Sequence, residues 1–541
     1  DGLPKNEYKS GTKLGRTSFK CLLSSSPIEL DYIKAEGLKG KIDTKLMAII
    51  AEKEGKRIYL NPNPEHEKIA KSIKPMWKPS EKLSTHSQYM GPPRYGYTTV
   101  GDLFANRQLN ALSTFSELVE EVYKIITRNG HKEYAKAVST YLAFIVDKCS
   151  DYWSTIATWM PRGTVGHVFA THVLPMTWGF PEANPFSSFH CSWEKAANWV
   201  VEEIEASFAD VKAGTSIQAC AKTVNFNNKI VSTDPPYYDN VPYGDISDYF
   251  YVWMKHSLKD IYPEAFSLIV TPKQDELIAD SKRWGKSADT FFMNGMKDVL
   301  TRITQQSHPA FPTTIYYAYK QKDIKNSTAV SKGWETFLSA LIKSRLHITG
   351  TWPLRTERKA RSRAMNSNAL ASSIVLVVRK RKDDAKVVSR KIFLKDLENI
   401  LPEALDDMIG GKEGILPIAP VDLAQAAVGP GMSIFSQYEA VLEADGTPML
   451  VHNALILINK AIEEYFTKAE SDMDADTRFC ADWFQQYGFK DGVFGEADVL
   501  ARAKGTSVDG VQDAGVIIAK GGKVRLIKVS EYPQDWDPKT D

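Results

Sequence analysis

The sequence predicts a mixed α/β protein whose middle part, residues 214–385, forms a doubly wound sheet. Short runs rich in β-branched and aromatic residues alternate there with segments of helical periodicity. One run, Ile230 to Thr233, stops abruptly at Asp234-Pro-Pro-Tyr237, because two consecutive prolines cannot donate hydrogen bonds to a sheet. The tetrapeptide is therefore expected to be a loop at the carboxyl end of a strand, where open α/β sheets bind their ligands.

Length and composition narrow the class of protein. A chain of 541 residues is long enough for about two to four domains. Its 43% apolar and 25% charged residues are typical of a globular protein, and no apolar run reaches the length of a membrane span. The first residues have no signal-peptide pattern. A net charge of +2 argues against a uniformly basic nucleic-acid coat, although local basic patches remain possible. We therefore expect no membrane partner.

The cysteines lie far apart and include no C-x-x-C pair. This spacing predicts neither a disulfide framework nor a metal site, and it favours a reducing cytoplasmic compartment. The five residues are Cys21, Cys149, Cys191, Cys220 and Cys480.

Before the predicted sheet, two regions differ in pattern. Residues 1–95 look irregular, with one candidate hairpin formed by Lys45–Ala51 and Arg57–Leu60. Residues 96–213 are expected to be mainly helical, because apolar residues recur there at spacings of three and four.

In region 214–385 the expected elements alternate and then finish with two strands joined by a long loop. The expected strands are 215–221, 230–233, 313–319, 346–352 and 373–378. The expected helices are 250–258, 288–305 and 334–342. This order is typical of a doubly wound sheet that ends in an antiparallel hairpin.

The tetrapeptide offers a specific chemistry. Asp234 supplies a carboxylate acceptor, Pro235 a backbone carbonyl on a chain of fixed φ, and Tyr237 an aromatic face. Two adjacent acceptors hold both hydrogens of a planar amino group while the ring stacks on the system that carries it. Drawing the lone pair away from that system prepares the nitrogen to attack an electrophilic methyl group. The structural alternative is a Pro-Pro turn capped by Asp, although such a pattern arises by chance only roughly 0.02 times in this length.

The tetrapeptide resembles the amino-methyltransferase signature, in which D-P-P-Y, N-P-P-Y or S-P-P-Y binds the target amine beside S-adenosylmethionine. The order of segments is similar to that of the large adenine-specific DNA methylases with a zinc ribbon and an N-terminal domain of unknown function. The most specific stretches are Gly101–Leu109, Ser232–Trp253 and Ser367–Ile374. The resemblance implies the second half of a Rossmann-like methyltransferase sheet, with catalytic roles for Asp234, Pro235, Pro236 and Tyr237.

The resemblance also implies a function. It indicates an S-adenosylmethionine-dependent methyltransferase acting on the exocyclic amino group of adenine in double-stranded DNA, in restriction-modification or phage defence. Cytosine is the first alternative target, although Asp234 favours adenine within the family. A glutamine amide in protein is a further alternative, against which Asp234 argues. The non-enzymatic alternative is a catalytically incomplete DNA-binding fragment of such an enzyme.

The residues that follow the tetrapeptide suit a pocket for one flipped base. Aromatic rings and carboxylates follow one another closely there, and they would close on the face of the base and read its edge. The pocket candidates are Tyr238, Asp239, Asn240 and Tyr243, whereas Tyr249, Phe250 and Trp253 fall at helical spacing and are expected in the core.

An arginine-rich loop is expected between the last two strands of the sheet. Five cations and one carboxylate occur in nine residues, and the guanidinium fork binds phosphate oxygens bidentately. A solvated charge run is the alternative. The arginines expected to contact the DNA are Arg355, Arg358, Arg361 and Arg363.

The first half of a methyltransferase sheet is missing from the sequence pattern. Cofactor binding in this fold needs a Gly-rich turn after the first strand. Gly410-Gly411 has no strand ahead of it, and Gly429-Pro-Gly431 follows the hairpin. The cofactor-binding residues are therefore not identified, and an upstream segment or a partner chain is expected to supply this loop. The family's zinc ribbon is either degenerate here or cut off upstream, because Ser24 or Ser25 stands where a second cysteine would follow Cys21.

Residues 386–541 read as helical and then winged-helix-like. The expected helices are 394–405, 421–427 and 453–465. The tail reads as helix 497–503, a short helix near Val511, and a hairpin with a Gly-Gly turn within Gly515–Lys528. A plain packing module is the alternative to a winged helix, because acidic residues offset the basic ones.

Overall fold

The computed structural model describes residues 12–15, 18–207, 211–239, 241–317, 332–355, 372–409, 420–471 and 473–532. The chain divides into two compact units. Unit 1 comprises Asp1–Cys220 and Asp239–Lys286, and unit 2 comprises Ala221–Tyr238 and Ser287–Asp541. The chain therefore passes between the units three times, and one passage directly follows the tetrapeptide. Helices and several small sheets confirm the mixed α/β class.

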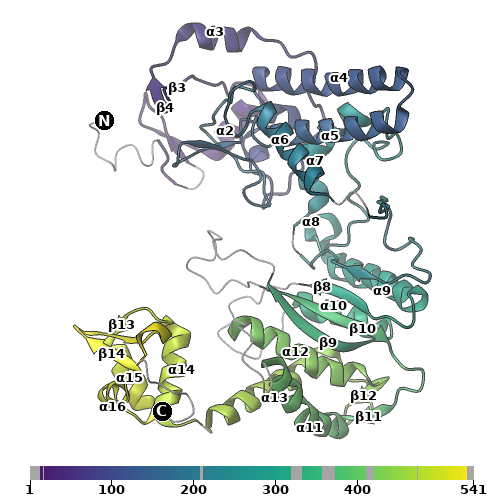
Figure 1. The fold of residues 1–541 in the computed structure, drawn as a ribbon, viewed down its shortest axis with the longest axis vertical. Helices are drawn as coiled ribbons and strands as arrows, with labels where there is room; N and C mark the ends of the chain where they lie inside the picture. The colour runs from purple at the N-terminus through teal and green to yellow at the C-terminus, as the bar shows by residue number, and fades with distance from the viewer. Residues whose placement is uncertain are drawn as a thin grey trace. The chain divides into compact units, whose positions relative to one another are not determined.

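Unit 1 is built around packed helices. The four longest are α4 (Asn106–Arg128), α5 (Lys132–Ser150), α6 (Trp193–Ala206) and α7 (Tyr243–Leu258) (Figure 1). α5 packs against the other three, and α7 also packs against α4. Their apolar stripes meet in one core in which Leu112, Trp153 and Trp253 have at most 1% of their surface exposed. Tyr249 is also buried and Phe250 packs against the core, so the core placement expected for these aromatic residues is confirmed.

The remaining elements of unit 1 are short. The expected hairpin is confirmed as β3–β4, with bounds shifted by a few residues because Glu54 and Gly55, both at positive φ, form its turn. The short elements are β1 (Phe19–Lys20), β2 (Pro27–Ile28), α2 (Leu30–Leu38), β3 (Ile49–Lys53), β4 (Lys56–Leu60), α3 (Pro64–Ser72), η1 (Pro92–Tyr95), η2 (Val100–Leu103), β5 (Thr158–Met160), β6 (Thr164–Gly166) and α8 (Ser281–Trp284), after which η3 (Gly285–Ser287) leads into unit 2.

A four-stranded sheet organises unit 2 (Figure 1). Its strands are β7 (Ser232–Thr233), β8 (Thr313–Tyr317), β9 (Leu346–Arg355) and β10 (Ser372–Lys380), in the order β7-β8-β10-β9. β7 and β8 are parallel, and β10 is antiparallel to both of its neighbours. β7, β8 and β9 therefore run in one direction and end at the same edge of the sheet.

The helices around this sheet follow the expected positions. They are α9 (Ala288–Gln306), α10 (Lys332–Lys343) and α12 (Pro420–Ser436). α9 packs on α10, and α12 packs on β9. Ile315 and Leu376 on the two central strands are fully buried, and so is Ile348 on the edge strand β9, against which α12 packs. The strands expected near 313, 346 and 373 and the helices near 288 and 334 are confirmed with boundaries shifted by at most three residues, whereas the helix expected at 250–258 begins at Tyr243 and belongs to unit 1.

One expected strand is wrong and another is shorter than expected. Residues 215–221 form no strand, and their side chains are mostly exposed. The run offers no aliphatic face to bury and has no neighbouring strand to pair with, so β-branched Thr215 and Ile217 do not suffice. β7 keeps only Ser232 and Thr233 of the expected 230–233, and of the two residues before it Ile230 is 64% exposed and Val231 is buried.

Between β10 and α14, the described residues of unit 2 are mainly helical, as expected, with one short pair of strands. β11 (Val387–Ser389) pairs in parallel with β12 (Ala440–Leu442), and α11 (Arg390–Ile409), α12 and α13 (Val451–Ser471) pack together. Gly429 and Gly431 lie inside α12. A Cβ at Gly429 would lie 1.8 Å from Thr351 Oγ1, and one at Gly431 would lie 2.3 Å from Ile458 Cγ2. These glycines therefore serve close helix packing.

The last part of unit 2 has its own small core around Phe479 and Trp483. Its elements are α14 (Ala475–Tyr487), β13 (Gly492–Val493), α15 (Phe494–Lys504), α16 (Val508–Asp513), β14 (Ile517–Lys520), β15 (Lys523–Leu526) and η5 (Val529–Glu531). The sheet order is β13-β15-β14. Gly521 and Gly522 have φ of 61° and 75°, which a tight two-residue hairpin turn requires. The expected order of helix, helix and hairpin is confirmed.

Candidate functional site

The tetrapeptide leaves the sheet where the sequence predicts. β7 ends at Thr233, and Asp234 is the first residue beyond it. Ser232 pairs with Thr314 and Thr233 pairs with Ile315 in the parallel ladder, so the tetrapeptide starts at the carboxyl end of two adjacent parallel strands. Open α/β sheets bind ligands at such an edge.

The chain that leads into β7 is held by backbone hydrogen bonds, although the strand itself is short. The N–H of Asn228 donates to the Gln306 carbonyl at 2.9 Å, and the N–H of His308 donates to the Lys229 carbonyl at 2.9 Å. The N–H of Thr314 donates to the carbonyl of Val231 at 3.1 Å. This segment therefore enters the tetrapeptide from a fixed direction.

Asp234 and Pro235 present two acceptors that the described residues do not use. The Asp234 side chain is exposed and makes no hydrogen bond or ion pair within the described part of the chain. No described residue donates to the Pro235 carbonyl either. Both oxygens are therefore available to the two hydrogens of a ligand amino group.

Tyr237 is half-buried, and a buried aromatic residue of the next strand holds its ring. The rings of Tyr237 and Tyr317 meet edge to face, with centroids 5.2 Å apart and planes inclined by 63°. Tyr317 is the last residue of β8, is 1% exposed, and stacks on Phe337 of α10 at 4.1 Å. The orientation of Tyr237 is therefore supported from the core.

Tyr238 is tied down at both its backbone and its hydroxyl. Its N–H donates to the Tyr317 hydroxyl at 3.2 Å, and its own hydroxyl donates to Asp289 in the first turn of α9. Lys332 pairs with the other oxygen of Asp289. The hydrogen bonds from Lys332 and Tyr238 lower the pKa of Asp289, so this carboxylate stays ionised. Gly333 leaves room for Tyr238, because a Cβ added at position 333 would lie only 2.9 Å from the Cβ of Tyr238.

The other expected site residues divide among unit 1, the end of β9 and the residues that the structure does not describe. Asp239 is exposed and belongs to unit 1. Tyr243 opens α7 in unit 1, is 54% exposed, and has its ring 6.5 Å from that of His172. Arg355 ends β9. The remaining candidates, Asn240, Arg358, Arg361 and Arg363, lie outside the described residues.

Sequence reasoning missed the residues that hold the tetrapeptide in place. Tyr317 lies in an apolar strand and looks like core, and Asp289 and Lys332 look like ordinary polar residues at helix starts. The only available signal was position, because Tyr317 ends β8, and Asp289 and Lys332 lie in the first turns of the helices before and after it. These positions face the carboxyl edge in a doubly wound sheet.

Two carboxylates that follow the tetrapeptide have a structural role. Asp245 and Asp248 on α7 are 5% and 4% exposed. Asp245 pairs with Arg283 at 2.7 Å, and Asp248 pairs with Lys273 at 2.7 Å. Burial disfavours the charged form of Arg283, but hydrogen bonds to Glu276 and Asp245 outweigh it and raise the pKa of this guanidinium. The pairs fasten the segment after α7 to that helix.

The stretch Gly101–Leu109 also has a structural role. Asp102 accepts from the backbone N–H groups of Thr98 and Thr99, both at 2.9 Å, and pairs with Lys78 at 2.6 Å. Burial opposes ionisation of Asp102, yet these hydrogen bonds bring its pKa down to about 2. The stretch therefore fixes the entry into α4.

Residues 21–25 form a tight turn that contains one thiol, that of Cys21. The Ser25 N–H donates to the Cys21 carbonyl at 2.9 Å, and Ser25 has a φ of 62°. A hydrogen bond from the Ser24 side chain, followed by those from the backbone of Ser24 and Leu23, lowers the pKa of Cys21. In the described residues no group of three or more His, Cys, Asp or Glu is placed to hold a metal ion.

S-adenosylmethionine, the cofactor that the resemblance implies, does not fit the described residues. β7 is the edge strand of its sheet, and the described residues 211–231 add no strand beyond it. No glycine with positive φ follows a strand of this sheet among the described residues. The Gly-rich turn that would admit the methionine part of the cofactor is therefore not supplied by them.

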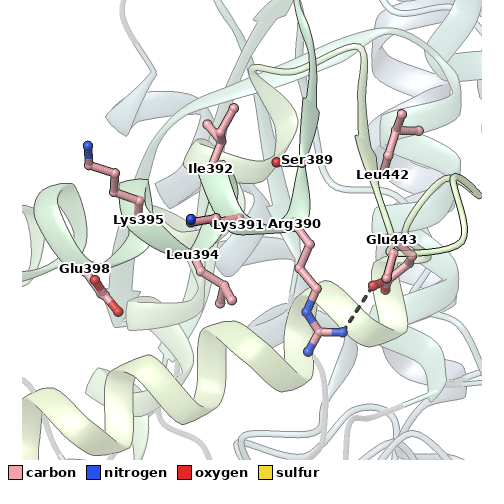
Figure 2. Close-up of a pocket in the computed structure, with 10 residues that line it drawn as sticks. Ser389, Arg390, Lys391, Ile392, Leu394, Lys395, Glu398, Leu442 and Glu443 are labelled. Carbon is pink, nitrogen blue, oxygen red and sulfur yellow. Dashed lines mark hydrogen bonds and ion pairs between the residues drawn. The ribbon is translucent and has the colours of Figure 1, made fainter.

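A surface depression of about 740 Å³ lies elsewhere in unit 2 (Figure 2). It is formed by the beginning of α11 and the end of β12, and Arg390 pairs with Glu443 at 3.1 Å on its wall. None of its lining residues belongs to the tetrapeptide or to the residues that hold it.

Comparison with known families gives one match. The family described as "Domain of unknown function (DUF8807)" matches residues 474–541, which include the part with the Phe479 and Trp483 core. No curated protein and no solved structure matches the chain. Among the described residues, no helix has both the length and the apolar character needed to cross a membrane.

Proposed function

We propose that this chain carries the amine-binding half of a DNA methyltransferase that acts on the exocyclic amino group of adenine. The observation that carries the proposal is the pair of acceptors on Asp234 and Pro235, which no described residue engages, at the carboxyl edge of β7 and β8. Tyr237 adds an aromatic ring beside them. These three groups match the requirements of a planar amino group on a conjugated ring.

The sheet supports the same proposal at the level of the fold. Two parallel strands followed by an antiparallel pair, in the order β7-β8-β10-β9, are what we expect of the second half of a doubly wound methyltransferase sheet. The arginine-rich segment follows β9, which ends at the same edge as β7. In this proposal its arginines bind phosphates of double-stranded DNA.

The residues of this chain would bind and orient the target base. Asp234 and Pro235 accept the two amino hydrogens and so draw electron density toward the nitrogen lone pair, and Tyr237 stacks on the base after it leaves the duplex. S-adenosylmethionine would supply the methyl group. We assign no residue to its binding, because the described residues do not fit it.

A specific observation favours a second candidate function. Because the described sheet has no strand beyond β7 and no glycine turn, the chain by itself also suits a catalytically incomplete DNA-binding part of such an enzyme. In this case an upstream segment or a partner chain would complete the cofactor site.

Two measurements test the proposal. Modified bases should be mapped in DNA from cells with and without the full-length protein, and N6-methyladenine should depend on it. Saturation-transfer NMR of the chain should be recorded with adenosine and with purine riboside, which lacks only the amino group. Stronger transfer to adenosine, lost in Asp234→Ala, supports the amine site. Equal transfer to both nucleosides, together with unchanged DNA modification, contradicts the proposed function.

A further inference from the structure

The tetrapeptide contains no regular secondary structure. Contacts other than a helix or a strand must therefore fix the positions of its acceptor oxygens and of the Tyr237 ring. A loop that orients an amino group needs placement to within about 0.5 Å. Pro235 and Pro236 fix φ but donate no hydrogen bonds, so the two prolines cannot anchor themselves to the sheet. The anchor must therefore come from the residues on either side.

On the carboxyl side, contacts from three elements converge on Tyr237 and Tyr238. Tyr317 of β8 touches both residues, because it packs against the Tyr237 ring and its hydroxyl accepts the Tyr238 N–H at 3.2 Å. Asp289 of α9 accepts from the Tyr238 hydroxyl and is itself paired with Lys332 of α10. The Tyr238 ring also meets Phe292 edge to face at 5.3 Å.

From this convergence we infer that Tyr317, Tyr238 and Asp289 are positioning residues for the D-P-P-Y loop. Tyr317 sets the angle of the Tyr237 ring and fixes the backbone just after it. Tyr238 and Asp289 hold the end of the loop against the first turns of two helices. The inference rests on the proposed function, because it gives these residues a part in presenting the amine.

The burial of Tyr317 suits this task better than a packing role alone. Its ring stacks on Phe337 with planes inclined by only 13°, at 4.1 Å, and the residue is 1% exposed. A phenylalanine would fill the same space, so packing does not require the hydroxyl. The hydroxyl accepts the hydrogen bond of the Tyr238 N–H at 3.2 Å, a contact that phenylalanine cannot make.

The test uses three single variants that each remove one hydroxyl. Tyr317→Phe removes the acceptor of the Tyr238 N–H, and Tyr238→Phe removes the donor to Asp289. Tyr316→Phe is the matched control, because Tyr316 is the preceding residue of β8 and alternates to the other face. All three keep the ring, so packing is disturbed little.

The first measurement is independent of activity. Hydrogen exchange is followed by mass spectrometry in peptides covering 230–238, where Pro235 and Pro236 contribute no amide hydrogen. In Tyr317→Phe we expect the Tyr238 amide to exchange about tenfold faster, since it loses a hydrogen bond. Tyr316→Phe should match the wild type. Unchanged exchange in Tyr317→Phe overturns the inference.

The second measurement uses methyl transfer to DNA by the full-length protein. Tyr317→Phe and Tyr238→Phe should lower kcat about ten- to a hundredfold, with KM for DNA and the melting temperature nearly unchanged. In an Asp234→Ala background Tyr317→Phe should cost nothing more, because the group that it aligns is gone.

The outcomes separate the two proposals. Faster exchange with an unchanged kcat, in an enzyme that Asp234→Ala inactivates, overturns the positioning role and leaves the proposed function standing. A drop in kcat that follows a lower melting temperature assigns Tyr317 a structural role and also overturns it. An inactive wild type, or an active Asp234→Ala variant, overturns the proposed function and this inference with it.

Discussion

Asp234 and Asp245 are eleven positions apart in the sequence and occupy opposite environments. Asp234 is exposed beyond the end of β7 and has no partner among the described residues, whereas Asp245 is 5% exposed and pairs with Arg283 at 2.7 Å. The carboxylate of Asp234 is accessible to a ligand, whereas that of Asp245 is already used in an ion pair within unit 1. The contrast separates a carboxylate that the described residues leave without a partner from one that an ion pair holds inside unit 1.

A third carboxylate, that of Asp147, is buried without an ion pair among the described residues. Asp147 on α5 is partly exposed as a residue, but its Oδ1 is buried and accepts no hydrogen bond within the described part of the chain. Burial raises the pKa of Asp147 well above its usual range. This side chain has no ligand in our proposal and no ion pair within the described part of the chain, so the burial of its charge destabilises unit 1.

The largest effect is expected from Asp234→Ala in the full-length protein. Methyl transfer to DNA should fall by about two to four orders of magnitude, because the amino group loses an aligned acceptor. DNA binding and the melting temperature should stay close to those of the wild type. Asp260→Ala, another exposed carboxylate, is the control. Wild-type turnover in Asp234→Ala would show that the exposed carboxylate has no catalytic part.

The reverse behaviour is expected from Asp245→Ala. The free energy of unfolding of unit 1 should fall by about 2–3 kcal/mol, somewhat below the usual range for a broken buried ion pair, because Arg283 keeps Glu276 and Asp280. Urea unfolding followed by tryptophan fluorescence measures this. Asp234→Ala should leave the urea midpoint unchanged, and equal midpoints for all three proteins would remove the distinction.

A smaller effect is expected from the cations of the loop after β9. Neutralising Arg358, Arg361 and Arg363 together should weaken binding to every DNA sequence and reduce the slope of log K against log salt by about 0.9 for each lost phosphate contact. Fluorescence anisotropy at several salt concentrations gives the slope. If only the sequence preference changed, the loop would read bases instead. Arg283, by contrast, belongs to a buried pair.

The smallest effect is expected from Asp147→Asn, and its sign depends on pH. Because the folded pKa of Asp147 is raised above the unfolded value of about 3.9, its favourable contribution is complete below that value and is lost as pH rises through the folded pKa. Asp147→Asn should therefore stabilise unit 1 at neutral pH, and the stability of the variant should fall less than that of the wild type as the pH rises. Melting temperatures between pH 4 and pH 8, compared with those of Asp245→Asn, provide the check. A destabilised Asn variant at pH 7 would contradict the assignment.

The sequence predicted the position of the tetrapeptide but not its support. Proline pairs and apolar runs are local signals, so the end of β7 and the strands near 313, 346 and 373 could be located. The anchoring contact between Tyr238 and Tyr317 joins residues 79 positions apart, and no local pattern encodes it. The expected strand 215–221 failed for the opposite reason, because local β-propensity found no neighbour to pair with.

The threefold passage of the chain between the units has a consequence for its synthesis on the ribosome. Ser232 of β7 contacts Thr314 of β8, which is synthesised 82 residues later. α4 and α5 likewise pack against α7, which is synthesised about a hundred residues after them. At about 5–20 residues per second, the 82-residue interval leaves β7 without its neighbouring strand for about 4–16 s. Unit 1 can close its core once residue 286 has emerged, whereas unit 2 still lacks every element from α9 onward at that point. The two cores are therefore completed in turn, and the segment that carries the tetrapeptide waits for its own core while unit 1 already closes around it in sequence.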